Sequence, residues 1–77
     1  VDIAEVAEKQ NLIELIIKAR KAAKLSQQGL AKKIGVTQGR IAQIESGLGT
    51  ANITFDLLLH LLSVLGYHFH IIAKKAA

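Results

Sequence analysis

Apolar side chains recur every three or four positions through the middle of the chain, which is the spacing of one face of an α-helix. This pattern predicts two short helices, over residues 27–34 and 38–46, each with a single apolar face. That face contains Leu30, Ala31 and Ile34 in the first helix, and Ile41, Ala42 and Ile44 in the second. We therefore expect both helices to pack against a common core.

The residues at the ends of these helices favour the same boundaries. Ser26 and Thr37 each precede a helix, and each carries a hydroxyl that can accept a hydrogen bond from a free backbone N–H, as an N-cap does. Gly35 and Gly47 follow the two helices, where a residue without a Cβ commonly ends a helix in the left-handed conformation. The segment 26–47 is therefore predicted to be a helix-turn-helix motif.

Residues 1–24 are predicted to be helical, as one helix or two, because they contain neither proline nor glycine and are rich in good helix formers. Four residues at helical spacing are expected to face the core: Leu12, Ile16, Ala19 and Ala23. Ile13 and Ile17 form a neighbouring apolar stripe, which either packs on a partner or extends the core face. The sequence leaves both alternatives open.

A loop over residues 47–52 leads to a third predicted helix, over residues 55–65, with Thr54 as its N-cap. Apolar side chains cover nearly the whole circumference of this helix, so we expect it to be buried on nearly all sides, in part by a second subunit. The residues assigned to this dimer interface are Leu58, Leu61 and Leu62.

Residues 67–73 alternate with the two-residue period that is typical of a β-strand, and Tyr67, Phe69 and Ile71 share one face. The backbone groups of an isolated strand need partners, so we expect this strand to pair with its copy across a two-fold axis and to belong to the dimer interface. The predicted fold is thus a single all-α domain, residues 1–77, with a short C-terminal strand.

Composition excludes several kinds of protein. A chain of 77 residues forms one small domain, which extra burial in a dimer would stabilise. The absence of cysteine excludes a disulfide framework and a thiolate zinc site. No apolar run approaches the roughly 20 residues of a membrane span, and the first residues are acidic, unlike a secretory signal. We therefore expect a cytoplasmic protein without a membrane partner.

Positive charge is concentrated around the predicted motif. The formal net charge is +4, yet residues 15–44 contain seven basic side chains and no acidic one. Such a segment suits a polyanion, because contacts with phosphates release bound counterions. A solvated lysine face is the alternative explanation of a charge run. The basic segment coincides with the predicted motif, and this favours a nucleic acid as the partner.

The outer face of the second motif helix carries the residues suited to read bases, namely Gln38, Gly39, Arg40 and Gln43. The first turns of a helix inserted in the major groove meet base edges. Glutamine pairs with adenine through two hydrogen bonds, and arginine pairs in the same way with guanine. Gly39 offers no side chain, which costs about 1 kcal/mol of helix propensity but lets the backbone come close to a ligand.

The stretch LSQQGLAKKIGVTQGRIAQIESG, residues 25–47, resembles the helix-turn-helix of the Cro/repressor (XRE) family of bacterial and phage regulators. The resemblance extends over about residues 12–65. It implies a λ-repressor-like helix-turn-helix bundle and a homodimeric regulator, a repressor by this hypothesis, that binds a palindromic operator in double-stranded DNA. The second motif helix is then the recognition helix.

The resemblance also implies roles for single residues. The residues matching Gln38, Gly39 and Gln43 face bases in this family, and Arg40 is expected to share the readout because Gly39 has no side chain. A buried ion pair between Arg20 and Glu45 is expected to join the preceding helix to the recognition helix. Gln27 is expected to support the recognition helix. Phosphate contacts are assigned to Gln27, Lys32, Lys33, Thr37 and Asn52.

A narrower hypothesis rests on the C-terminal segment. Antitoxins of the HipB and HigA kind carry a similar strand after their last helix, so the resemblance implies that the chain is an antitoxin with a toxin protein as partner. The alternative from a different class is a protein–protein interaction module that keeps the helix-turn-helix as a scaffold and does not read DNA.

Catalytic and metal sites are not predicted. His68 and His70 share a strand face, but no cysteine or acidic residue lies nearby in sequence, so solvent-facing histidines are expected. His60 is expected to be partly buried in the core or at an interface. The serines lack a histidine and an acid in a catalytic arrangement, and no glycine-rich phosphate loop occurs. We therefore expect no enzyme activity, no metal and no cofactor.

Overall fold

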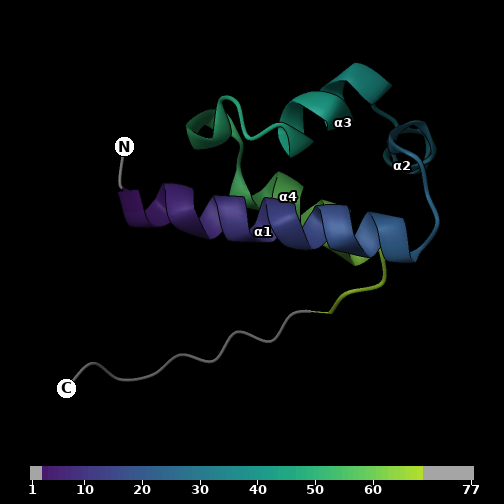
Figure 1. Ribbon diagram of the computed structural model, residues 1–77, viewed down its shortest axis with the longest axis horizontal. Helices are drawn as coiled ribbons and strands as arrows, with labels where there is room; N and C mark the ends of the chain where they lie inside the picture. Colours follow the sequence, from purple (N-terminus) through teal and green to yellow (C-terminus); the bar gives the residue numbers. More distant parts are fainter. Residues whose placement is uncertain (1–2, 69–77) are drawn as a thin grey trace.

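The computed structural model describes residues 3–68, with side chains from residue 5 onward, and in this part of the chain all regular structure is helical. Its elements are α1 (Ile3–Ala22), α2 (Gln27–Ile34), α3 (Gln38–Glu45), the 3-10 helix η1 (Thr50–Asn52) and α4 (Phe55–Val64). Helices α1 and α4 lie together in the lower layer of Figure 1, and α2, α3 and η1 lie above them. The predicted all-α helix-turn-helix bundle is confirmed.

Three hydroxyl side chains cap the helices as predicted. Ser26 accepts a hydrogen bond from the backbone N–H of Gly29 at 2.9 Å. Thr37 and Thr54 accept equivalent bonds at 3.1 Å and 3.2 Å. Gly35 ends α2 with a φ of 78°, in the left-handed region. The limits of α2 are those predicted, and α3 and α4 each end one residue earlier than predicted.

The long first helix is a single helix, and its buried face differs from the predicted one. Ile16 and Ala19 are buried, as expected, and Leu12 is half-buried. Ala23 was expected in the core, but it is exposed and lies beyond the end of α1 at Ala22, so this prediction was wrong. Ile13 is 3% exposed and lies in the core, because α1 packs against α3, η1 and α4 and needs a wide apolar face.

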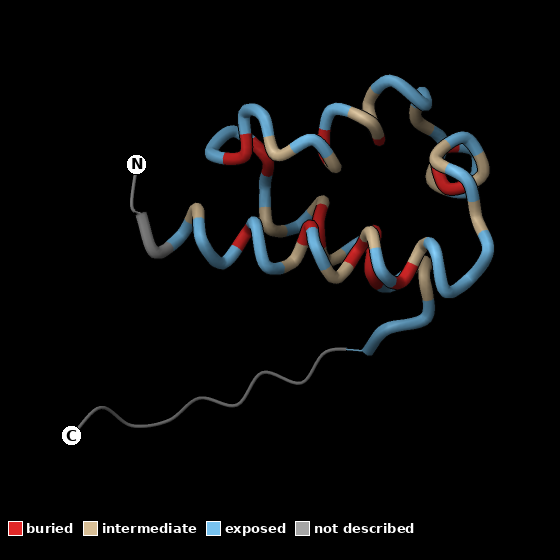
Figure 2. The backbone as a smooth tube through the Cα atoms, in the orientation of Figure 1, coloured by how far each residue is buried: buried red, intermediate tan, exposed pale blue. Residues whose placement is uncertain are grey.

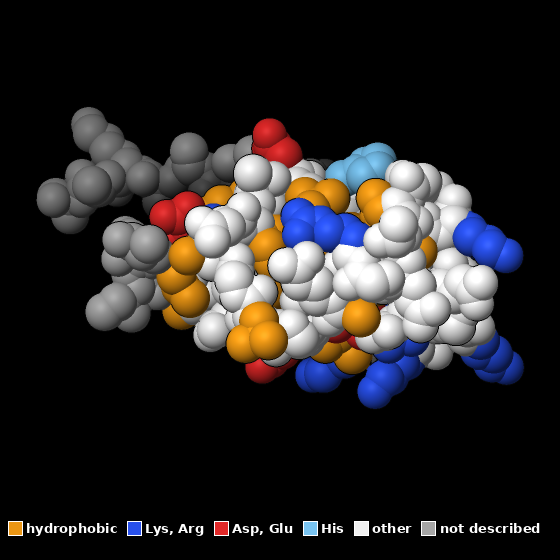
Figure 3. Space-filling view, turned by 90° about the horizontal axis from the view of Figure 1, so that it is seen from above, with side chains coloured by type: hydrophobic (Ala, Val, Ile, Leu, Met, Phe, Trp, Pro, Cys, Tyr) orange, Lys and Arg blue, Asp and Glu red, His pale blue; other side chains and the backbone are white. Residues whose placement is uncertain are grey.

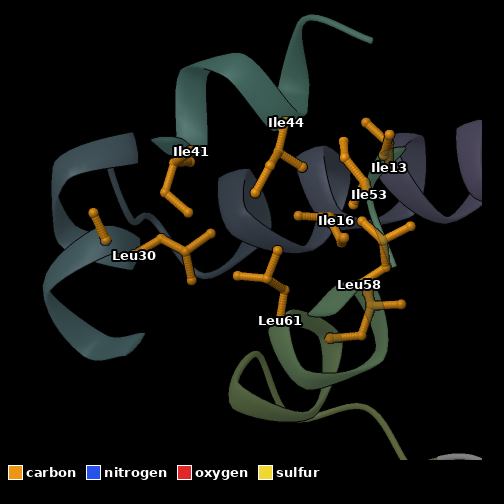
Figure 4. Close-up of a cluster of buried hydrophobic side chains, with 10 residues drawn as sticks. Ile13, Ile16, Leu30, Ile41, Ile44, Ile53, Leu58 and Leu61 are labelled. Atoms are coloured by element: carbon orange, nitrogen blue, oxygen red, sulfur yellow. The ribbon is translucent and has the colours of Figure 1, made fainter. Parts of the chain in front are cut away.

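The core lies between the two layers. Buried positions, red in Figure 2, occur in every element. Ile16, Leu30, Ile41, Ile44 and Leu61 point toward one another from all four α-helices (Figure 4). Burial of each such side chain contributes about 1.5–3 kcal/mol, so the core holds α2 and α3 on the α1 and α4 layer.

Helix α4 requires a correction of the predicted dimer interface. Leu58, Leu61 and Leu62 are all 0% exposed within the single chain, where they pack against the other helices. Side chains without accessible surface cannot contact a second subunit, so the assignment of these three residues was wrong. His60 is exposed in the single chain, so its expected burial in the core is wrong, and its place at an interface remains a prediction. Within the single chain α4 is covered mainly by α1, and Asp56, His60 and Ser63 are exposed along it, so the helix is not buried on nearly all sides as predicted.

The predicted C-terminal strand falls mainly outside the described residues. Tyr67 and His68 are exposed and belong to no helix or strand, and Tyr67 is 40% exposed. Phe69, Ile71 and the rest of the segment lie outside the described part of the chain. Strand pairing across a dimer therefore remains a prediction.

Candidate nucleic-acid interface

The outer face of α3 is directed away from the core by two isoleucines. Ile41 and Ile44 are each 1% exposed and fix the helix on the scaffold. On the other side of α3, Gln38, Gly39 and Gln43 are exposed. Three of the predicted base-facing residues thus share an accessible surface, as the helical repeat requires.

Arg40 and Gln43 hydrogen-bond to each other on this surface. Arg40 is half-buried, and its Nη1 donates to Oε1 of Gln43 at 3.1 Å. The backbone N–H of Arg40 donates to the Thr37 hydroxyl at 3.1 Å. A guanidinium carries five N–H donors and an amide carries two, so this contact leaves donors on both side chains for a base edge. The free chain therefore holds two candidate base-reading side chains side by side.

A buried polar cluster holds the opposite side of α3. Arg20 Nε donates to Oε2 of Glu45 at 2.7 Å, and Arg20 Nη2 donates to Oε1 at 3.0 Å. The two side chains are only 11% and 7% exposed. Arg20 Nη1 also donates to the Leu25 carbonyl at 2.9 Å. The ion pair that the resemblance implies is present, and this two-point geometry joins the end of α1 to the end of α3.

Gln27 supports the same cluster from α2. Its Nε2 donates to Oε1 of Glu45 at 3.2 Å, and the residue is half-buried. Its amide therefore helps to position α3 relative to α2. The bond to Glu45 occupies one of the two amide donors and leaves the other free of this contact. The expected phosphate contact of Gln27 remains a prediction.

The predicted phosphate-binding residues lie around α3 on three elements. Lys32 and Lys33 are exposed in the last turn of α2, and Thr37 is exposed at the start of α3. Asn52 is exposed in η1, beyond the other end of α3. In the view onto α2 and α3, basic side chains lie mainly in the right half, where α2 lies, and acidic side chains lie mainly in the left half (Figure 3). The positive end of this face thus borders the start of α3.

Gly39 is not required by the fold. Its φ is not positive, and a Cβ added there would meet only the Thr37 hydroxyl, at 3.9 Å. A glycine without steric cause on an exposed helix lowers helix propensity. The fold gives no reason for glycine here, and the missing side chain leaves room for a ligand to approach the α3 backbone.

Two features were not found from the sequence. Leu48 is 74% exposed in the loop after α3. Lys9, in contrast, is 4% exposed, and its Nζ lies 3.2 Å from Oε1 of Glu5, 3.3 Å from the Ala51 carbonyl and 5.2 Å from the centre of the Phe55 ring. Lys9 thereby ties α1 to η1 and to the start of α4. A leucine between two glycines was a signal for the first feature, whereas Lys9 resembled the other helical lysines.

The described residues contain neither a metal-binding cluster nor a helix suited to cross a membrane. No group of three or more His, Cys, Asp or Glu side chains there is arranged to hold a metal ion. His68 is exposed, and His70 lies outside the described part of the chain. None of the helices described is both long enough and apolar enough to cross a membrane.

Comparison with known proteins gives one match. The model of a family described as helix-turn-helix matches residues 16–72, which include the second part of α1 and all of α2, α3, η1 and α4. Neither the curated proteins nor the solved structures compared with the chain include a match. The match covers the Arg20 and Glu45 pair and every residue of the candidate interface.

Proposed function

Because the chain belongs to the helix-turn-helix family of XRE-type DNA-binding regulators, we propose that it is a transcriptional repressor that recognises a palindromic operator as a homodimer. Two copies of α3 would enter successive major grooves on one side of the duplex, about one helical turn apart. The proposal involves no catalytic step and no cofactor.

The observation that carries the proposal is the presentation of α3. Its inner face is fixed by Ile41 and Ile44, and its C-terminal end is fixed by Glu45. Gln38 and Gln43 are left exposed on the outer face, with glutamine chemistry suited to adenine. A helix held this firmly can insert into a groove without losing much conformational entropy on binding.

Charge supports the same partner. Lys32 and Lys33 project beside the start of α3, where they would reach phosphates next to the bases read by α3. Phosphate contacts supply affinity without sequence preference, whereas contacts to base edges supply the preference. We therefore expect α2 to supply mainly affinity and α3 to supply mainly specificity.

The proposal is tested by selection from a random pool of DNA duplexes. The full chain is bound to the pool, bound duplexes are amplified and sequenced, and affinity is measured at two salt concentrations. We expect a palindromic consensus and an affinity that falls steeply with salt. Salt-sensitive binding without any consensus would contradict sequence-specific recognition.

The alternative function is a protein–protein interaction module, and two observations favour it. Gly39 puts no side chain at a base-facing position, and Leu48 exposes an apolar side chain beside α3. The selection experiment separates the two functions, because an interaction module would enrich no sequence. An antitoxin role remains a prediction from the resemblance, and co-purification with the product of a neighbouring gene would test it.

A further inference from the structure

We propose that Lys9 is a positioning residue for DNA binding, which holds the segment after α3 so that Asn52 meets a phosphate. This inference rests on the proposed function and adds to it a residue that does not touch DNA itself. Lys9 lies in the first half of α1, outside the candidate interface.

The Lys9 ammonium is buried among three partners. Lys9 is 4% exposed, although a lysine is almost never buried unless it is paired. Its Nζ lies 3.2 Å from Oε1 of Glu5 and donates to the Ala51 carbonyl at 3.3 Å. It also lies 5.2 Å from the centre of the Phe55 ring, within the range of a cation–π contact. These contacts fix the ammonium between α1 and the segment that follows α3.

Two of the three partners lie on either side of Asn52. Ala51 precedes Asn52 in η1, and Phe55 is the first residue of α4. The bond to Ala51 joins residues 42 positions apart in sequence. Among the hydrogen bonds of the described residues, it is the one that ties η1 to α1 through a side chain. Lys9 therefore helps to set where η1 sits on the first helix.

The other hydrogen bonds of this segment are local. The Thr50 hydroxyl donates to the Gly47 carbonyl at 2.6 Å, and the Ile53 N–H donates to the Thr50 carbonyl at 3.1 Å. Gly47 and Gly49 have φ values of 77° and 69°, in the left-handed region that favours glycine. These features fix the shape of the segment, and burial of Thr50 and Ile53 packs it inward. The bond from Lys9 adds the polar contact that ties this shape to α1.

Asn52 lies at the opposite end of α3 from the lysines of α2. The 3-10 helix η1 is in the same layer as α3, above α1 and α4 (Figure 1), and Asn52 is exposed in it. Lys32 and Lys33 are exposed beside the start of α3. An asparagine amide carries two N–H donors, and asparagine is one of the side chains that contact DNA phosphates. Phosphate contacts at both ends of α3 would fix its register along the groove.

Holding η1 in the free chain favours this contact. A loop that becomes ordered only on binding loses conformational entropy at that moment, and this loss lowers the affinity. Because Lys9 holds η1 before DNA arrives, Asn52 is already presented to the phosphate. The effect reaches DNA through an uncharged amide, so Lys9 releases no counterion and does not enter the salt dependence of binding.

The contact joins the part of the chain that matches the family model to a part that does not. The match covers residues 16–72, which include Asn52 and Phe55. Lys9 and Glu5 precede it. The DNA affinity of the matched part therefore depends on a side chain outside it.

Two other roles for Lys9 are distinguishable from this one. A direct bond to DNA does not fit an ammonium that is buried against a carboxylate and a carbonyl. A role in stability alone is opposed by the general behaviour of buried ion pairs, because their replacement by an apolar side chain of similar volume is often neutral. Ala51 is exposed, so water can reach its carbonyl in Lys9→Met. This variant should keep its melting temperature within about 5 °C.

The first measurement is amide hydrogen exchange in the full chain without DNA. Lys9→Met removes the ammonium and keeps an apolar stem, and Lys18→Met, at an exposed position of the same helix, is the matched control. Exchange of the Ile53 N–H, which closes η1, should accelerate about tenfold in Lys9→Met, the factor for loss of a hydrogen bond to a charged group. The Leu30 N–H, which is bonded at the start of α2, should exchange as before in both variants.

The second measurement is titration of a duplex that carries the selected consensus, and of single-base variants of this duplex. Lys9→Met should weaken binding about three- to tenfold on all of them alike, with an unchanged salt slope. Asn52→Ala should weaken binding by a similar factor. The double variant should lose no more than Asn52→Ala alone, because Lys9 acts through Asn52. Lys18→Met should bind as the unmodified chain does.

Several results would overturn the positioning role. Unchanged Ile53 exchange in Lys9→Met would show that Lys9 does not hold η1, and unchanged DNA affinity would show that holding η1 does not matter for binding. Losses that add in the double variant would show that Lys9 does not act through Asn52. A salt slope lowered by about 1 would place Lys9 on a phosphate.

Loss of cooperative melting in Lys9→Met would assign Lys9 to the fold alone and would also overturn the proposal. Failure of the unmodified chain to bind any duplex has a different meaning. It would contradict the proposed function, whereas the exchange of Ile53 would still report whether Lys9 holds η1.

Discussion

Two arginines donate hydrogen bonds to side chains of α3, and the two contacts lie on different sides of the helix. Arg20 reaches Glu45 through two bonds, of 2.7 Å and 3.0 Å, and the Glu45 side chain is 7% exposed. Arg40 reaches Gln43 through a single bond of 3.1 Å at the surface. The first contact joins elements 25 residues apart in sequence, whereas the second joins neighbours on one helix.

We expect the two contacts to serve different properties: the Arg20 contact the stability of the fold, and the Arg40 contact the recognition of DNA. An ion pair withdrawn from water costs much to break, because the remaining charge stays buried without a partner. A surface contact between a guanidinium and an amide is exchanged for water at little cost. The Arg20 contact therefore fixes the position of α3, while the Arg40 contact leaves two polar side chains that, under the proposed function, would exchange it for contacts with a base.

The largest effect is expected from Glu45→Ala. It leaves the Arg20 charge buried and removes the acceptor of Gln27, so the free energy of unfolding should fall by about 3–5 kcal/mol. Urea denaturation followed by circular dichroism measures this change. Since a domain of this size has only a few kcal/mol of net stability, we expect a large fraction of the variant to be unfolded even without urea. A loss below about 1 kcal/mol would instead indicate a screened surface pair.

Gln43→Ala should show the opposite behaviour. Stability should change by less than about 0.5 kcal/mol, as for other surface substitutions. Operator binding should weaken by about 1–3 kcal/mol, with relaxed preference at one base pair. Affinities for the consensus and for single-base variants of it provide the measurement, with Asn11→Ala on exposed α1 as the control. Equal weakening on every sequence would show that Gln43 does not read a base.

The same contrast explains what the sequence could predict. The ends of α2 and α3 depend on nearest neighbours, so Ser26, Gly35 and Thr37 were enough to place them. The Arg20 and Glu45 pair joins residues 25 positions apart. No local pattern indicates such a pair, and it was expected only from the family resemblance.

Burial was harder to predict than helix formation. The apolar pattern identified α1 and α4, but it did not show which neighbour covers each face. Ile13 was therefore left between core and partner, and Leu58 was assigned to a dimer although it lies in the core. Lys9 was missed because its burial depends on η1 and α4, which approach it from 40 or more residues along the chain.

A smaller effect is expected from Lys33→Ala, which removes a charge from the exposed last turn of α2, where we expect phosphate contacts. Affinity should fall alike on all sequences, and the slope of log affinity against log salt should decrease by about 1. Between 50 mM and 200 mM salt this amounts to a change of about fourfold. Lys21→Ala, in the exposed last turn of α1, is the matched control and should leave the slope unaltered. A change in base preference would place Lys33 at a base edge.

The smallest effect is expected from Gly39→Ala, which adds a single Cβ atom and should change stability and DNA affinity in opposite directions. A Cβ there meets no atom closer than 3.9 Å, so the helix should gain about 0.5 kcal/mol, measured by urea denaturation. If the α3 backbone approaches DNA at this position, operator affinity should fall while stability rises. Gly35→Ala is a contrasting control, because its φ of 78° makes that substitution destabilising. Unchanged operator affinity in Gly39→Ala would show that the start of α3 keeps its backbone away from the groove.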